Sequence, residues 1–295
     1  MYNRILLPLL EDDPRKTITL VGVKVRKIMY PLLKIIIPMT LKRKLVLLTP
    51  RQKPKKPTIF VSTHEFREDI EAAFYAAGVP LYIVNGSVKV IMNSFDGILN
   101  WIGGMILFDR ANKKSRKAVK EKMIYALEKG ANILLYPEGT WNKSPNQIIS
   151  GLFPGVYEVA KRSGAQIIPI ANHRENTKIY SEIGVPFDIS KMECEEAMET
   201  VKEHLATLRY DLIEKRGTFR RSELPMGKKL DLFWKDHIDA LMAEVPHYDY
   251  ELEKHTKYRE KGVVFSDEAY DFFKNIRPSF DTAFLFRGNE RWWKK

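Results

Sequence analysis

The sequence predicts an α/β fold, a sandwich of helices around a largely parallel central sheet. Three observations lead to this prediction: short apolar strands alternate with helical patterns from residue 58 to about 217, a basic amphipathic segment precedes them, and helical patterns follow as a C-terminal extension. Parallel strands need crossover connections, and helices usually provide them. A chain of 295 residues with 44% apolar and 29% charged residues can bury one sizeable core.

Residues 1–57 form the first predicted region. The first 60 residues carry 14 Lys and Arg but only 3 Asp and Glu, so they hold nearly all of the net charge of +12. Between Leu20 and Leu48, apolar blocks alternate with basic residues, and we expect Pro31 and Pro38 to interrupt any helix there. No run of about 18 uncharged apolar residues occurs, so we do not expect a spanning helix.

This basic segment fits an anchor that lies in the membrane interface. Its apolar side chains would enter the headgroup boundary of an anionic membrane surface, while its lysines and arginines stay in water. We therefore expect a peripheral, monotopic protein on the cytoplasmic face. The alternative is that the segment packs on the core with solvated lysines. The proline-broken stretch Arg51–Pro57 (RQKPKKP) is expected to be a linker without regular structure.

The second region, residues 58–217, contains the predicted sheet. Its expected strands are Thr58–Ser62, Leu81–Val84, Met105–Phe108, Ala131–Tyr136 and Gln166–Ala171. Its expected helices are Arg67–Ala77, Lys113–Lys129 and Gly155–Ser163. The third region, residues 218–295, is expected to add helices at Asp231–Ala243 and Asp267–Asn275. Periodicity does not indicate whether this extension covers a site, binds a partner or contacts a membrane.

Composition excludes several kinds of site. The single cysteine, Cys194, rules out an internal disulfide and a cysteine-based metal cluster. The six histidines show no paired ligand spacing, so we expect no metal. No nucleic-acid-binding motif accompanies the basic stretch, and we expect no nucleic-acid partner. The opening residues carry too short an apolar run for a secretory signal, so we expect no export.

The candidate catalytic pair is His64 with Asp69, in the stretch STHEFRED. A histidine held by a carboxylate can deprotonate a hydroxyl near neutral pH. Five residues of helix advance about 500°, so on one regular helix the two side chains would point about 140° apart and could not meet. We therefore expect His64 at or before the first turn of a helix, which a capping box of Ser62 and Glu65 would open. A capped histidine with a purely structural role is the alternative.

Four motifs follow one another in order along the chain. They are H-x-x-x-x-D at His64–Asp69, GMILFDR at Gly104–Arg110, LLYPEGT at Leu134–Thr140 and QIIPIAN at Gln166–Asn172. With these motifs the chain resembles the PlsC-type glycerolipid acyltransferases, which include 1-acylglycerol-3-phosphate acyltransferases, over about residues 58–190. The resemblance implies transfer of a fatty acyl chain from an acyl thioester to a hydroxyl of a lysophospholipid acceptor. Acyl-CoA or acyl-carrier protein would be the donor substrate, and no cofactor is implied.

The candidate site residues take their roles from this chemistry and from the resemblance. His64 is the candidate general base and Asp69 would fix its tautomer; since no G-x-S-x-G elbow is present, no covalent acyl-enzyme is expected. By the resemblance, Glu138 and Gly139 are further catalytic residues that align the reactants. The expected substrate-binding residues are Arg110 for the acceptor phosphate, Thr140, Trp141, Asn142 and Pro169, which would shape the acceptor pocket.

Two departures from the family pattern bear on the acceptor. Trp141 and Asn142 stand where many members have Arg and Ser, and LFPG at residues 152–155 stands where many have Phe-Lys-x-Gly. Two fewer cations should weaken binding of a phosphate monoester, so a glycolipid or another non-phosphatidate acceptor is an alternative. A non-catalytic membrane-surface binding protein is a further alternative. Candidate substitute cations are His173, Arg174 and Lys143.

Overall fold

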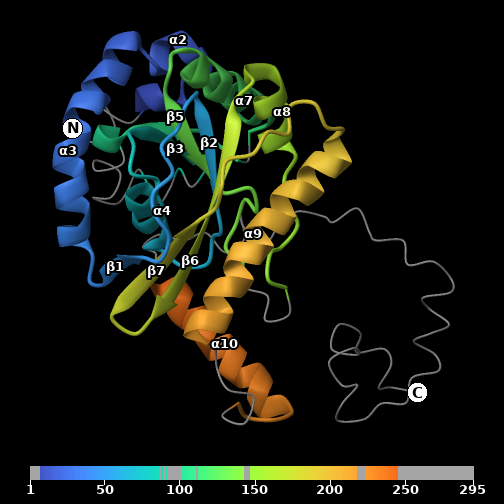
Figure 1. Ribbon diagram of the computed structural model, residues 1–295. Helices are drawn as coiled ribbons and strands as arrows, with labels where there is room; N and C mark the ends of the chain where they lie inside the picture. The colour runs from blue at the N-terminus through green and yellow to red at the C-terminus, as the bar shows by residue number, and fades with distance from the viewer. Residues whose placement is uncertain are drawn as a thin grey trace, which may run out of the picture. The chain divides into compact units, whose positions relative to one another are not determined.

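The computed structural model (Figure 1) describes residues 7–86, 88, 91, 101–110, 112–142, 147–217 and 224–244. All of these belong to one compact unit, Met1–Tyr258. The second unit, Arg259–Lys295, lies outside the described residues, and so do the helix expected at residues 267–275 and the candidate cation Lys143.

One sheet of seven strands lies at the centre of the described unit (Figure 1). The strands are β1 (Lys44–Leu47), β2 (Thr58–Ser62), β3 (Leu81–Asn85), β4 (Met105–Leu107), β5 (Asn132–Leu135), β6 (Gln166–Glu175) and β7 (Lys178–Ile183). Their order across the sheet is β1-β7-β6-β2-β5-β3-β4. The strands from β6 to β4 run parallel, whereas β7 is antiparallel to β6 and β1 is parallel to β7. The predicted largely parallel sheet is confirmed.

The five predicted strands are all present, and all but one of their ends agree to within one residue. The exception is β6, which continues to Glu175 because its second half pairs with the antiparallel β7. Neither β7 nor β1 was predicted from the sequence. A turn of only two residues, with Asn176 at a φ of 49°, separates β6 from β7, and β1 lies inside the stretch interpreted as an amphipathic anchor. Both strands therefore depend on pairing that local pattern does not reveal.

Helices flank the sheet. They are η1 (Leu7–Leu10), α2 (Pro14–Thr17), α3 (Leu20–Thr40), α4 (Asp69–Ala77), α7 (Lys113–Glu128), α8 (Gly155–Ser163), α9 (Cys194–Arg216) and α10 (Lys228–Ala243). The predictions for α4, α7, α8 and α10 are confirmed to within three residues at each end. The prediction missed α9, which buries only four side chains along 23 residues and so carries a weak apolar period.

The two faces of the sheet carry separate hydrophobic cores. Ile59 and Val61 of β2 face one core, to which α7, α8 and α9 contribute. Phe60, between them, faces the other core, to which α3 and α4 contribute. All three side chains are fully buried, as expected of a strand covered on both faces. Alternating residues of one strand thus pack against the helices on opposite faces of the sheet.

The helix α3 corrects the prediction that prolines interrupt the N-terminal segment. It is one continuous helix that includes both Pro31 and Pro38. Each internal proline costs about 3 kcal/mol, and the burial of Tyr30 and Leu33 against Phe74 and its neighbours on the core offsets part of that cost. The alternative that the segment packs on the core therefore holds for the inner face of α3.

Two further expectations about the N-terminal region can be compared with the structure. Residues 51–57 contain neither helix nor strand, as predicted for the linker. Among the helices that the structure describes, none combines the length and apolarity needed to cross a membrane.

Candidate active site

The candidate site lies at the carboxyl edge of the parallel strands. His64 follows the end of β2 by two residues, and Glu138 follows the end of the adjacent β5 by three. Arg110 follows the end of β4, which runs parallel in the same sheet. In parallel sheets the carboxyl ends of the strands face one edge, where loops bring side chains together. The topology therefore gathers three of the four sequence motifs at one place.

The His64 ring is held by Asp69. Its Nδ1 lies 3.0 Å from Oδ1 and 3.1 Å from Oδ2 of the carboxylate. Asp69 is the first residue of α4 and is fully buried, and its Oδ2 also accepts hydrogen bonds from the backbone amides of Glu65 at 2.7 Å and Phe66 at 3.1 Å. The amides and the helix N-terminus stabilise the anion. The carboxylate thus holds the hydrogen on Nδ1 and leaves Nε2 as the acceptor nitrogen.

The expected capping box is absent, which corrects one prediction. The Ser62 hydroxyl donates to the Thr63 carbonyl oxygen, and Glu65 pairs with Arg209 instead of reaching back to residue 62. The helix begins at Asp69 with no side-chain cap, and the Asp69 carboxylate binds the amides of Glu65 and Phe66 in the preceding loop. His64 still precedes the first turn, as its spacing from Asp69 required.

Two aromatic rings enclose the imidazole of His64. The Tyr136 ring lies 4.3 Å from it, centroid to centroid, at an interplanar angle of 33°, and the Trp141 ring meets it edge-on at 5.9 Å. The Tyr136 hydroxyl donates to the Asp69 carbonyl oxygen at 3.3 Å, and burial raises the pKa of Tyr136 well above its ordinary value, so the ring stays neutral. The sequence interpretation included Trp141 but missed Tyr136, although Tyr136 directly precedes the P-E-G-T motif.

Glu138 connects the loops on either side of the site. It is buried, and its Oε1 accepts from the backbone amide of His64 at 3.3 Å. Its Oε2 accepts from the amide of Ser150 at 2.9 Å and from the Ser150 hydroxyl at 2.7 Å. Burial raises the pKa of the Glu138 carboxyl, and the Ser150 hydrogen bonds act against that shift. Both oxygens thus bind protein groups, an arrangement suited to holding His64 in position.

The residues after Glu138 form a tight turn against an aromatic ring. Gly139 has a φ of 69°, and a Cβ built on it would lie 2.3 Å from the Phe153 ring, so only glycine fits. Its amide donates to the Tyr136 carbonyl oxygen at 3.0 Å, and Thr140, next along the chain, is half-buried. The Asn142 amide donates to the His64 carbonyl oxygen at 2.6 Å. These hydrogen bonds hold the E-G-T segment against the residues around His64.

Arg110 extends along the same edge of the sheet. A Cβ built on Gly86, directly after β3, would lie 2.5 Å from Arg110 Cγ and 2.8 Å from Cδ. Because β3 lies between β4 and β5, the arginine stem crosses the end of β3 next to the strand that carries Glu138. Three strand spacings, about 14 Å, separate β4 from β2. The structure places Arg110 at this edge, some distance along it from His64.

Three other candidate residues, Pro169, His173 and Arg174, have surroundings that differ from those expected from the sequence. Pro169 is buried inside β6 opposite Val61, with its ring against Gly184, so it lies within the sheet. Burial lowers the pKa of His173 to about 4, so this candidate cation is neutral at physiological pH, which corrects the hypothesis. Arg174 is paired at 2.7 Å with Glu244, the residue that directly follows α10.

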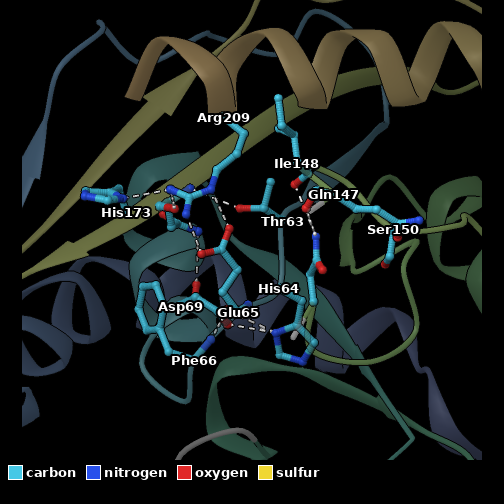
Figure 2. Close-up of polar contacts among 12 residues, drawn as sticks. Thr63, His64, Glu65, Phe66, Asp69, Gln147, Ile148, Ser150, His173 and Arg209 are labelled. Carbon is cyan, nitrogen blue, oxygen red and sulfur yellow. Dashed lines mark hydrogen bonds and ion pairs between the residues drawn. The ribbon is translucent and has the colours of Figure 1, made fainter. Parts of the chain in front are cut away.

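Sequence reasoning missed a residue that joins the site from α9. Arg209 contacts both Glu65, next to the base, and His173 of β6 (Figure 2). It also missed Asn172, whose buried side chain and amide bind Ser62 and Thr63 and so hold the end of β2 against β6. Asn172 ends one of the motifs, but no pattern in the sequence distinguishes Arg209 from the other charged residues of α9.

Comparisons with known proteins find similarity to acyltransferases. A family model described as "Acyltransferase" matches residues 44–173. The chain is 28% identical over 190 residues to a "1-acyl-sn-glycerol-3-phosphate acyltransferase" of Haemophilus influenzae, an alignment that covers 60% of this chain and 75% of that protein. It is 26% identical over 147 residues to the Escherichia coli protein of the same name, with 45% of this chain and 58% of that one covered.

A solved structure shares the fold. It is the 1-acyl-sn-glycerophosphate acyltransferase PlsC from Thermotoga maritima, with a TM-score of 0.51 and 14% sequence identity over 73% of this chain and 89% of that chain. At this identity the likeness concerns the fold. It extends the similarity beyond the residues that the family model matches.

Proposed function

The chain belongs to the PlsC-type acyltransferase family, and from this premise we propose that it transfers a fatty acyl chain from an acyl thioester to a hydroxyl of a lysophospholipid at a membrane surface. The acceptor is of the 1-acylglycerol-3-phosphate kind, and the donor is acyl-CoA or acyl-carrier protein. One observation carries the proposal: the buried, hydrogen-bonded Asp69 carboxylate holds His64 through Nδ1 and directs Nε2 to act as a base.

The proposed reaction uses the histidine twice. Nε2 of His64 accepts the proton of the acceptor hydroxyl while that oxygen attacks the thioester carbonyl carbon. Asp69 stabilises the imidazolium that forms. The tetrahedral intermediate then collapses, the carbon–sulfur bond breaks, and the leaving thiolate takes the proton from Nε2. The products are an ester and a free thiol, and the enzyme returns to its starting state.

The other site residues support this base. Glu138 binds the amide of His64 and both polar groups of Ser150, so we assign it the role of positioning the base. The turn at Gly139 brings the Phe153 ring to the site. Arg110 is the candidate for the acceptor phosphate, because a guanidinium binds phosphate oxygens in pairs.

One observation favours a second acceptor class. Trp141 lies edge-on to His64, and Phe153 covers Gly139, so two aromatic side chains occupy positions where many relatives carry cations. Aromatic faces suit a sugar ring or a weakly charged head group better than a phosphate monoester. Acyl transfer to a glycolipid is therefore the second candidate, and Trp141→Arg should shift preference toward lysophosphatidate. Unchanged preference in that variant would count against the glycolipid acceptor.

The outer face of α3 supports attachment to a membrane. Six large apolar residues recur there at intervals of four and three, which places them on one stripe of the helix. They are Val21, Val25, Ile28, Leu32, Ile35 and Met39, each between 48% and 78% exposed. Exposed lysines at positions 24, 27 and 34 flank the stripe. Such a surface fits a helix that lies in the headgroup boundary of an anionic membrane, which agrees with a peripheral protein.

Acyl transfer by the purified protein in detergent tests the proposal. Acyl-carrier protein and coenzyme A thioesters are offered with lysophospholipids and lysoglycolipids, and product is measured for wild type and His64→Ala. We expect the variant to lose about a hundredfold or more of the rate. His204→Gln, on α9 with its ring stacked on Phe187, is the matched control and should retain the wild-type rate. Absence of product with every pair, in folded protein that binds liposomes, would contradict the proposal.

A further inference from the structure

Arg209 lies outside the four sequence motifs, yet it contacts three residues at the candidate site. Its Nη2 donates to Glu65 Oε2 at 2.7 Å, and its Nε lies 2.5 Å from Glu65 Oε1, so the pair is bidentate. Its Nη1 donates to Nδ1 of His173 at 2.8 Å and to the Asn172 carbonyl oxygen at 3.4 Å. The Arg209 side chain is 12% exposed, so these bonds form largely away from water (Figure 2). A bidentate, mostly buried pair of this kind fixes geometry.

Glu65 links this pair to the base. It directly follows His64, its amide donates to Asp69 Oδ2 at 2.7 Å, and its carboxylate binds Arg209. Movement of the Glu65 side chain toward water would therefore pull on the amide that orients Asp69. Burial raises the pKa of Glu65 to about 7, and Arg209 is the strongest influence that lowers it. The arginine thus keeps this carboxylate in place next to His64.

Besides fixing geometry, Arg209 balances the negative charge of Glu65 beside His64. The titratable groups that face His64 and Glu65 are Asp69 on α4, Tyr136 and Glu138 after β5, His173 on β6 and Arg209 on α9. Three of the residues in this set, with Glu65 included, are carboxylic acids, and the tyrosine and the second histidine are neutral. Among the described residues of this group, Arg209 supplies the positive charge that balances Glu65.

We propose that Arg209 is a positioning residue for acyl transfer: through Glu65 it holds the loop that carries His64 and Asp69, and it offsets the carboxylate beside the base. This inference rests on the proposed function, with His64 as the base. Arg209 lies beyond residue 173, where the match to the family model ends. A helix outside the matched segment therefore helps to position the catalytic pair.

The charge balance makes a test possible in which the two partners behave differently. In Arg209→Met the buried Glu65 loses the cation that lowers its pKa, so the carboxyl is protonated and the net charge beside His64 does not change. The acid limb of kcat/KM should therefore stay at the wild-type pH, while kcat falls because the bidentate bond is lost. In Glu65→Gln the guanidinium is unopposed, and the limb moves to lower pH. This displacement should be about one pH unit, as expected for one charge roughly 12 Å away at an effective dielectric of about 20. The double variant Glu65→Gln/Arg209→Met should return the limb to the wild-type position.

Two further variants separate positioning from general stability. Arg209→Lys keeps the charge but loses the bidentate bond, so its limb should stay at the wild-type pH while kcat falls about tenfold. Arg216→Met is the matched control, because Arg216 lies on the same helix, pairs with Glu175 at 2.9 Å and covers the Tyr180 ring. It should change neither the limb nor kcat. A limb that stays at the wild-type pH in Glu65→Gln, or a kcat that is unchanged in both Arg209→Met and Arg209→Lys, would overturn the inference.

A measurement without substrate distinguishes this inference from the proposed function. The ring signals of His64 are identified by their loss in His64→Gln and titrated by NMR in wild type, Arg209→Met and Glu65→Gln. A titration curve displaced to lower pH in Glu65→Gln supports the coupling, because the unpaired guanidinium disfavours protonated His64. An inactive wild type would contradict the proposed function, while the NMR curves decide separately whether the Arg209 charge acts on His64; an unmoved curve in Glu65→Gln overturns that.

Discussion

The helices α3 and α9 are nearly equal in length and both pack on the sheet, but their outer faces differ. The 23 residues of α9 bury Ala197, Val201, Leu205 and Leu212, and among its large apolar side chains Tyr210 is exposed. The 21 residues of α3 bury three side chains, and a stripe of six large apolar residues is exposed opposite them. The outer face of α9 suits water, whereas the outer face of α3 is apolar.

The difference extends to the arginines on the two helices. Arg26 of α3 binds the Tyr82 hydroxyl and the Trp101 carbonyl oxygen, and so fastens the helix to the core. Arg209 of α9 binds Glu65, next to the base, and so reaches the site. Under the proposed function, α3 is the helix that would contact the membrane, and α9 is the helix that holds Glu65 beside the candidate base His64. The predictions below test this division of roles, beginning with the largest expected effect.

The strongest test changes the exposed stripe of α3. Ile28→Glu with Ile35→Glu should weaken binding to anionic liposomes by at least a hundredfold, because two apolar side chains no longer enter the headgroup boundary and two like charges approach it. Flotation with vesicles measures the affinity. Tyr210→Glu, the exposed position on α9, is the control and should bind like wild type. If the α3 double variant binds liposomes as tightly as wild type, the proposed role of α3 in membrane attachment is wrong.

The inner faces of the two helices should behave alike. Leu33→Ala on α3 and Leu205→Ala on α9 each open a cavity at a buried position, so each should reduce the free energy of unfolding by about 2–5 kcal/mol. Urea denaturation followed by circular dichroism measures both. A loss below about 1 kcal/mol for Leu33→Ala would indicate that α3 is not held on the core in water.

The basic residues of α3 should contribute less than its apolar stripe. Lys27→Gln should reduce affinity for anionic liposomes about fivefold, since one lysine near such a surface contributes about 1 kcal/mol. The effect should shrink in high salt, because the attraction is screened. Lys202→Gln on α9 is the control, and a matching loss there would mean that binding follows overall charge rather than this face.

The smallest predicted effect is on the pH dependence of stability, and it comes from His173, which Arg209 of α9 binds. His173 has its pKa lowered to about 4 in the folded state, so the unfolded chain binds more protons between about pH 4 and 6.5, and stability falls as pH falls through that window. From pH 6.5 to 5.5 the loss should be about 1 kcal/mol. His173→Asn should show a smaller loss by urea denaturation at the two pH values. An unchanged pH dependence would contradict this.

The candidate site was predictable where chemistry and local spacing act together. The separation of five positions between His64 and Asp69 excluded a shared helix, and in the structure His64 lies ahead of α4 while Asp69 is its first residue. The position of Tyr136 could have been inferred from the motif that follows it. By contrast, Ser62 and Glu65 match a capping box, yet the carboxylate of Asp69 takes the loop amides. The sequence pattern allows several hydrogen-bond partners for the loop amides, and the packing of the folded chain determines which one binds them.

The sequence by itself determined the α/β class, the five parallel strands, the order of the motifs and the excess of positive charge at the N-terminus. These follow from local periodicity and composition, which residues close together in the chain encode. Only the tertiary structure decided that β1 and β7 extend the sheet, that α3 presents one face to the core and one outward, and that Arg209 meets Glu65, 144 positions away. Contacts between distant residues depend on how the elements pack, so no local pattern could reveal them.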